Sequence, residues 1–243
     1  MNATSAPFLT ELDSRAEIKG SRDPLGIQSV WVRFGRHVVG NLTTVSNSLR
    51  DFTTLILGYW LIEEASGKVA DGSQLAIFLR WEQLAAYARL QLNNESVFRG
   101  IERTKKALSE SRRVTISSAP QHQILSNQKI YGLWGLYSVP SATSGLVIQD
   151  PPSLSARARE FVTQACLPVL QKAGAKPGEL VDFLIEDRVR VDIDDSNRLV
   201  RATAAVLKDR LHVTERPFYR FHLIEGGPDD PTRGLQRQLA ELL

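Results

Sequence analysis

The sequence predicts a mainly α-helical protein with a central module that resembles a winged helix-turn-helix and carries a small β-hairpin, flanked by helical segments. Three observations favour this fold class. Apolar residues recur at intervals of three and four through most of the 243 residues, which is the spacing of one helix face. The middle of the chain follows the order helix, turn, helix, hairpin. Hydrophobic residues make up 42% of the sequence and charged residues 23%, as in ordinary globular proteins.

The chain is expected to divide into three parts. Residues 1–26 form a flexible arm that ends in a turn at the segment RDPLG. Residues 27–150 hold the N-terminal helices and the winged-helix-like module. Residues 151–243 form a helical C-terminal domain, because the Pro-Pro pair that begins at Pro151 favours a boundary and helical patterns follow it.

Two helices are predicted before the central module. Apolar residues from Ile27 to Phe34 recur at helical spacing and predict a short amphipathic helix. A longer helix is expected over residues 44–64, where the apolar residues keep the same spacing for several turns. Thr43 or Thr44 is its expected N-cap, because a hydroxyl there accepts an otherwise unpaired backbone N–H.

The segment GNLTTVSNSLR, residues 40–50, is polar but has no charge before Arg50. The face of the long helix opposite its apolar stripe carries short hydrogen-bonding groups and one cation, namely Ser46, Asn47, Arg50 and Thr54. Free N–H groups and the helix dipole favour an anion at a helix N-terminus, so Asn47 and Arg50 are candidate phosphate contacts. The alternative is that these residues cap the helix and contact another part of the protein.

The central module is expected to begin after the turn ASGKVADGSQ. One or two short helices continue to about Leu90 and end at the Asn-Asn pair that begins at Asn93. A second helix is predicted over residues 95–109. Short strands at residues 114–117 and 122–125 would pair as a hairpin, which is the order of elements in a winged helix-turn-helix.

The second helix of this module lies in the most basic part of the chain. Residues 80–113 contain eight cations and four acids. Arg99, Arg103 and Lys106 lie at i, i+4 and i+7, so we expect them on one outward face. The nucleic-acid contacts expected on this helix, at its N-terminus and on the wing are Asn94, Ser96, Arg99, Arg103, Lys106, Arg112 and Arg113. The alternative is a solvated helix whose charge is partly offset by glutamates.

Beyond the module the sequence predicts further helices and one strand. A helix capped by Asn127 continues through QKIYGLWGLY and ends at Pro140, with its aromatic residues in the core rather than stacked on bases. A strand is expected over residues 216–225. The C-terminal helices are expected at residues 154–166, 179–188, 198–209 and 234–243, with an interruption at Pro168.

Catalytic motifs are absent from the sequence. Acidic residues between Asp182 and Asp195 could hold a divalent cation for phosphodiester hydrolysis, but arginines interleave with them and the segment DIDDSN is typical of a polar turn before a helix cap. Cys166 is expected to be a small buried residue. We therefore expect no metal, no cofactor and no enzymatic activity, and a metal-dependent nuclease remains the third alternative.

The sequence also indicates where in the cell the protein is expected. The single cysteine excludes an internal disulfide, and the first residues contain acids and few apolar side chains, unlike a signal peptide. The longest apolar run, residues 55–62, is too short to span a bilayer. A cytoplasmic protein without a membrane partner is expected.

Two stretches, RDPLGIQSVWVRFGRHVVGNLTTVSNSLRDFTTLILGYW and QKIYGLWGLYSVPSATSGLV, resemble uncharacterised proteins encoded in bacterial antiphage defence islands beside helicases and nucleases. The likeness extends over much of residues 1–150 and transfers no functional residue. It implies an accessory subunit of a multi-gene defence system. The sequence thus predicts a non-enzymatic subunit that binds nucleic acid, with double-stranded DNA as the expected ligand. The alternative is a protein-interaction subunit that docks onto a helicase or nuclease.

Overall fold

The structure, a computed structural model, describes residues 26–40, 46–70, 72–208 and 213–243. The predicted arm lies outside the described residues except for Gly26, and so do the expected N-caps Thr43 and Thr44. Over the described residues the protein is mainly helical, as predicted, with two small two-stranded sheets. A search of the described residues for a helix that is long and apolar enough to cross a membrane finds none.

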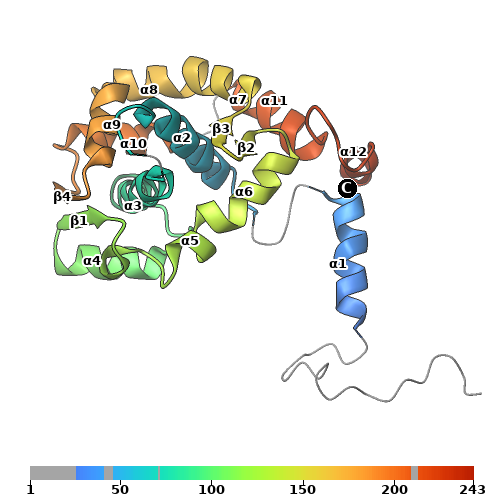
Figure 1. Cartoon of the computed structure of the whole chain (residues 1–243), viewed down its shortest axis with the longest axis horizontal. Coiled ribbons are helices and arrows are strands. Elements are labelled where there is room, and N and C mark those ends of the chain that lie inside the picture. The colour runs from blue at the N-terminus through green and yellow to red at the C-terminus, as the bar shows by residue number, and fades with distance from the viewer. Residues whose placement is uncertain (1–25, 41–45, 71, 209–212) are drawn as a thin grey trace, which may run out of the picture.

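Two long helices, α2 (Leu49–Ala65) and α3 (Gln74–Asn93), lie at the centre, and the other elements surround them (Figure 1). The α2 helix begins later than predicted because Ser48 is its N-cap, with the Ser48 hydroxyl accepting the Asp51 N–H at 3.3 Å. The α3 helix is one long continuous helix, where one or two short helices were expected. It ends where predicted, since Asn94 adopts a left-handed conformation with φ 53°.

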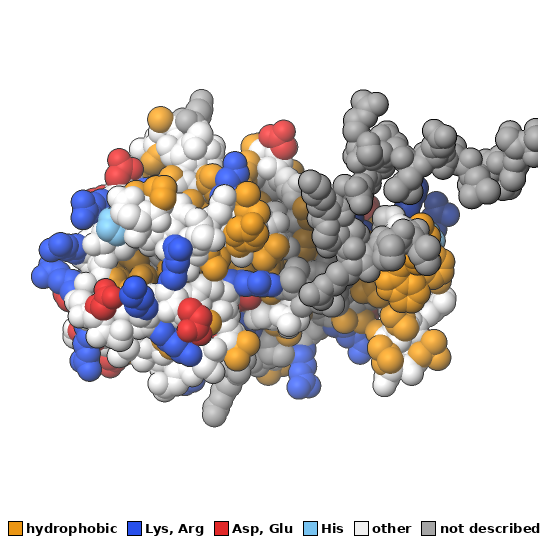
Figure 2. All heavy atoms as spheres, turned by 90° about the horizontal axis from the view of Figure 1, so that it is seen from below, with side chains coloured by type: hydrophobic (Ala, Val, Ile, Leu, Met, Phe, Trp, Pro, Cys, Tyr) orange, Lys and Arg blue, Asp and Glu red, His pale blue; other side chains and the backbone are white. Residues whose placement is uncertain are grey.

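The first helix, α1 (Ile27–Val38), stands apart from this body and touches it near α12 (Leu235–Leu242) (Figure 1). None of its residues is buried, and Trp31 keeps 72% of its surface exposed. The predicted amphipathic helix is confirmed, but its apolar stripe packs against no described core. Figure 2 shows apolar side chains gathered at the right-hand end of the molecule, where α1 lies in Figure 1.

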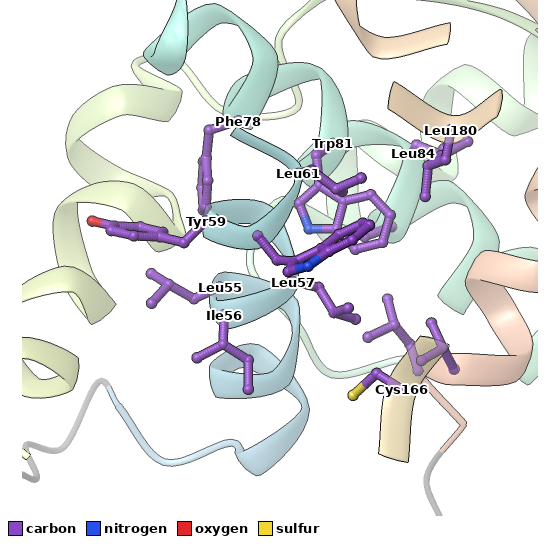
Figure 3. Close-up of a cluster of buried hydrophobic side chains, with 14 of the residues drawn as sticks. Leu55, Ile56, Leu57, Tyr59, Leu61, Phe78, Trp81, Leu84, Cys166 and Leu180 are labelled. Carbon is purple, nitrogen blue, oxygen red and sulfur yellow. The ribbon is translucent and has the colours of Figure 1, made fainter. Parts of the chain in front are cut away.

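The hydrophobic core is built around α2. Figure 3 shows Leu55 and Tyr59 on this helix, with Phe78 and Trp81 coming from α3. The Trp81 indole N–H donates to the Thr54 backbone oxygen at 2.8 Å, so the ring is buried with its polar atom satisfied. The helices touch at Gly58, where an added Cβ would lie 2.6 Å from the Phe78 ring.

Shorter helices enclose this pair. They are α4 (Ile101–Glu110), α5 (Gln128–Tyr131), α6 (Leu133–Thr143), α7 (Ala156–Phe161), α8 (Leu167–Lys172), α9 (Pro177–Ile185), α10 (Arg198–Val206) and α11 (Glu215–Tyr219). A π-helical turn joins α7 to α8, and a second one, Arg220–Ile224, extends α11. Asn127 caps α5 as predicted, and Asn197 caps α10 at the end of the segment DIDDSN.

The predicted wing hairpin is wrong in its second strand. Strand β1 (Arg113–Ser117) lies where it was expected, but it pairs antiparallel with β4 (Arg188–Asp192), with Val114 opposite Val191. The strand expected at residues 122–125 does not form, and residues 120–122 form a 3-10 turn. The other sheet pairs β2 (Val147–Gln149) with β3 (Pro152–Leu154). The two strands of this ribbon are therefore far apart in the sequence and are not joined as a hairpin.

Three further local predictions are wrong. Residues 216–225 are helical rather than extended, because α11 and its π-helical turn bury Tyr219 and His222 on one side. Pro140 lies inside α6 instead of ending it. Pro168 does not interrupt its helix, since it sits in the first turn of α8, where a missing backbone N–H costs little.

One cluster of buried side chains takes residues from both sides of Pro151. The α10 helix packs on α3, α9 packs on α2, and β4 pairs with β1. The division of the chain at this proline stays a prediction, and these contacts connect the two sides.

Candidate nucleic-acid interface

The residues expected to contact nucleic acid lie in two neighbouring places. Arg103, Lys106, Arg112 and Arg113 are exposed on α4, on the loop after it and on β1. The other five line one hollow beside the start of α4, namely Asn47, Arg50, Asn94, Ser96 and Arg99. Gly100 alone separates Arg99 from the first residue of α4. The two regions are therefore adjacent along the chain.

The α4 helix begins later than predicted, so Arg99 precedes it and does not share its surface. Arg103 and Lys106 lie at i and i+3 on its exposed side, while Thr104 is buried against the body. In the described part of the chain neither cation forms an ion pair, and Arg103 donates only to the Gln123 backbone oxygen at 3.3 Å. The side chains of Arg103 and Lys106 are thus exposed, as predicted.

The ribbon of β1 and β4 adds two arginines that sequence reasoning missed. Val114 and Val191 face the core, so the alternate residues face outward. Arg188 and Arg190 are exposed there; in the register Arg190 lies two positions from Asp192, the partner of Arg113, and Arg188 lies at the other end of the ribbon, opposite Ser117. The alternation RVRVD is the signal for them in the sequence, where they interleave with the acidic residues considered for metal binding.

We call the exposed cations of α4 and the ribbon the basic face: Arg103, Lys105, Lys106, Arg112, Arg113, Arg188 and Arg190. Within the described residues, Arg113 alone among them forms an ion pair, at 3.9 Å from Asp192. Figure 2 shows this side of the molecule, with Lys and Arg side chains spread over the left half and acidic side chains between them. The surface has mixed charge with positive side chains predominating.

The hollow has a volume of about 850 Å³, and buried ion pairs lie behind its wall. Arg89 is buried behind it and donates to Asp51 at 2.6 Å and to both carboxylate oxygens of Glu95 at 2.8 and 2.5 Å. Burial alone would lower the pKa of Arg89, but pairing with Glu95 and Asp51 raises it. The acids near the hollow are therefore held by an interior cation.

Tyr137 completes this network from α6. Its hydroxyl donates to the second Asp51 oxygen at 3.1 Å. Burial raises the pKa of Tyr137, and the charge of Asp51 raises it further. The phenol stays protonated and remains a hydrogen-bond donor, so the floor of the hollow is fixed by α2, α3 and α6 together.

Arg50 is not the free phosphate contact that was expected. It is buried and pairs with Glu215 at 2.7 Å. Ser46 and Thr54 are also buried, and the Thr54 hydroxyl donates to the Arg50 backbone oxygen at 2.8 Å. Of the described residues at the end of the uncharged segment, Ser46 and Arg50 are thus buried, where an unpaired charge would be costly. Asn47 remains exposed at the rim of the hollow.

Two of the eight cations in residues 80–113, Arg80 and Arg89, are buried inside the protein. Arg89 serves the network described above, and Arg80 donates to the Leu184 backbone oxygen at 2.6 Å, with Asp187 at 3.5 Å. Neither can reach an external polyanion. The positive charge available to a ligand comes instead from α4, the loop after it, β1 and β4.

The acidic residues considered for metal binding make structural contacts. Asp182 pairs with Lys68 at 2.8 Å, and Asp194 accepts backbone N–H groups of the turn before α10. No three His, Cys, Asp or Glu side chains in the described ranges come together in a way that could hold a metal ion. Cys166 is buried as predicted, and burial raises its thiol pKa to about 12, so it is a poor nucleophile.

The comparisons with known proteins bring no relative. No protein-family model, curated protein or solved structure matches the chain.

Proposed function

We propose that this protein binds nucleic acid through the basic face and has no catalytic role of its own. One observation carries the proposal: six of the seven cations on α4 and the ribbon are exposed and, over the described residues, form no ion pair. Cations that form no internal ion pair can displace counterions from a phosphate backbone. Double-stranded DNA is the expected ligand, because a helix and a ribbon side by side suit contacts to successive phosphates.

The resemblance to proteins of antiphage defence islands suggests a biological role for this binding. An accessory subunit that holds DNA would bring it to a helicase or nuclease encoded nearby. The accompanying acids, Glu102 and Glu110 among them, would keep the affinity moderate and dependent on salt.

Salt titration of DNA binding tests the proposal. The affinity for a labelled duplex, measured by fluorescence anisotropy at several salt concentrations, should fall linearly on a log–log plot. Reversing two charges of α4, Arg103→Glu with Lys106→Glu, should weaken binding by about tenfold or more at low salt and reduce the slope by about 2. Arg188→Glu with Arg190→Glu should have an effect of the same order.

A matched control reverses two cations elsewhere. Lys172 and Lys176 are exposed near α8, which lies on the opposite side of the central helices from α4 (Figure 1). Their reversal to Glu changes net charge by the same amount and should affect affinity far less. Equal loss in the control and in the α4 variant, or no binding at low salt, contradicts the proposal. A parallel titration with duplex RNA decides between the two nucleic acids.

A second function, docking to a protein partner, is favoured by α1. Its apolar residues recur at i, i+3, i+4 and i+7, the pattern of a helix that enters a groove of another protein. Trp31 and Phe34 are exposed at 72% and 64%, and aromatic anchors of this kind dominate protein interfaces. Replacing both by Glu should abolish such docking in a binding assay with the product of a neighbouring helicase or nuclease gene, and leave DNA affinity unchanged.

A further inference from the structure

The hollow beside α4 contains one cation, Arg99, that forms no ion pair with a described residue. Arg99 is half-buried in its wall, and across the described residues it has no hydrogen bond or ion pair. Arg50 and Arg89, by contrast, are held by Glu215, Asp51 and Glu95. Since these acids already have internal partners, Arg99 is free to meet an anion from outside.

The remaining lining suits a nucleotide better than a bare phosphate. Asn47, Asn94 and Ser96 are exposed and, in the described structure, their side chains make no hydrogen bond, so amide and hydroxyl groups are available to a base or sugar. Phe98 and Val97 add apolar surface against which a base can lie. The volume of about 850 Å³ falls in the range of small-ligand sites.

A base in a duplex cannot enter such a hollow, because it is stacked and paired until it is unpaired or displaced. An unpaired nucleotide at a strand end can. Gly100 holds the turn between the hollow and α4, with φ 85°, and an added Cβ there would lie 3.0 Å from the Ile124 backbone oxygen. The short fixed turn keeps Arg99 next to the cations of α4.

We infer that the hollow binds an unpaired terminal nucleotide of a nucleic acid whose duplex part lies on the basic face. The preferred ligand is thus a duplex with a single-stranded overhang. This inference rests on the proposed function and names its substrate class. The shared chemistry is a phosphate ester that carries a base, which a free mononucleotide also offers.

The test compares one duplex in blunt form and with a short overhang, using wild-type protein and two variants. Arg99→Ala removes the free cation, and Ser96→Trp fills the hollow while retaining Arg99; both positions lack side-chain partners, and circular dichroism checks the fold. Wild-type protein should bind the overhang duplex about tenfold more tightly than the blunt one. Either variant should abolish this preference with little change in blunt-duplex affinity, whereas reversal of Arg103 and Lys106 weakens both.

The outcomes separate the two proposals. Equal affinity of the wild type for both duplexes, with Arg99→Ala neutral, overturns the inference and leaves the proposed function standing. Absence of binding to either duplex overturns the proposed function. Binding of adenosine monophosphate that depends on Arg99, without any overhang preference, assigns the hollow to free nucleotides and also overturns the inference.

Discussion

Arg89 is the charged residue on which the interior of this protein depends most. Its side chain is 3% exposed and it satisfies two carboxylates at once, while its guanidinium also lies 5.0 Å from the centre of the Phe98 ring. Without the cation, Asp51 would remain buried and charged beside Glu95. Removing one member of a buried pair is far more destabilising than the net contribution of the pair, because the remaining charge cannot be hydrated.

Arg89→Met should therefore lower the free energy of unfolding by roughly 3–5 kcal/mol, measured by urea denaturation. The matched control is Arg103→Met, which removes the same side chain from an exposed site and should change stability by no more than about 0.5 kcal/mol. Similar losses in both variants would mean that the interior network contributes nothing specific.

Glu82 provides a second prediction at this scale. It is buried on α3 and accepts the Leu133 N–H at 2.7 Å and the Gln128 side-chain amide at 2.8 Å. Burial raises its pKa from 4.5 to about 7. A carboxyl whose pKa is raised by folding contributes stability below its unfolded pKa, and loses that contribution as the pH rises through its folded pKa.

The stability of wild type relative to Glu82→Gln should fall by on the order of 3 kcal/mol between about pH 4.5 and about pH 8. Urea denaturation of both proteins across this range measures the difference, and Gln cannot titrate. A difference that is independent of pH would show that Glu82 keeps its charge in the folded protein.

At the scale of elements, the contact between α2 and α3 depends on Gly58. Ala is the better helix former by about 1 kcal/mol, yet its methyl group would lie 2.6 Å from the Phe78 ring and 2.8 Å from Trp81. Overpacking of this kind costs more than the gain in helix propensity.

Gly58→Ala should destabilise the protein by roughly 1–3 kcal/mol in thermal or urea unfolding. Gly35→Ala is the control, because Gly35 lies inside α1 with nothing within 4 Å of the added Cβ. Global unfolding of this control should be unchanged, and α1 should become slightly more helical. A neutral Gly58→Ala would show that the two helices can move apart at no cost.

Most helices were predictable because their signal is local. The bodies of α2, α10 and α12 follow from apolar spacing, and the caps Asn127 and Asn197 follow from side chains that can accept backbone N–H groups. Strand β4 was not predictable in the same way. Nothing within residues 113–117 indicates that their partner lies at residues 188–192, because pairing between distant segments is decided by how the whole chain packs.

The candidate site was predictable in part for the same reason. Exposed cations on α4 follow from helical periodicity, and the exposure of Arg103 and Lys106 agrees with it. Periodicity could not show that Arg50, Arg80 and Arg89 are buried, because their partners Glu215, Leu184 and Asp51 come from other elements. The sequence reveals which residues are charged, but only tertiary contacts reveal which charges are neutralised.

At the scale of the whole molecule, the core is shared between the segments before and after Pro151. The partner of strand β1 lies after this residue in the sequence, and so does α10, which packs on α3. A fragment that ends at Asp150 would leave these apolar surfaces in water.

Fragments 1–150 and 151–243, expressed separately, should each lack a cooperative thermal transition in circular dichroism, and their mixture should recover one. The intact chain is the reference. A cooperative transition of the first fragment alone would establish the predicted boundary as a true domain limit.

The exposed position of Trp31 gives the protein an intrinsic optical reporter. Of its four tryptophans, Trp60 and Trp81 are buried and Trp134 is half-buried, so acrylamide should quench chiefly the red-shifted emission of Trp31. Whatever covers α1 would shift this emission to shorter wavelength and shield it from the quencher. Binding partners for this helix can therefore be screened with unlabelled protein in a fluorimeter.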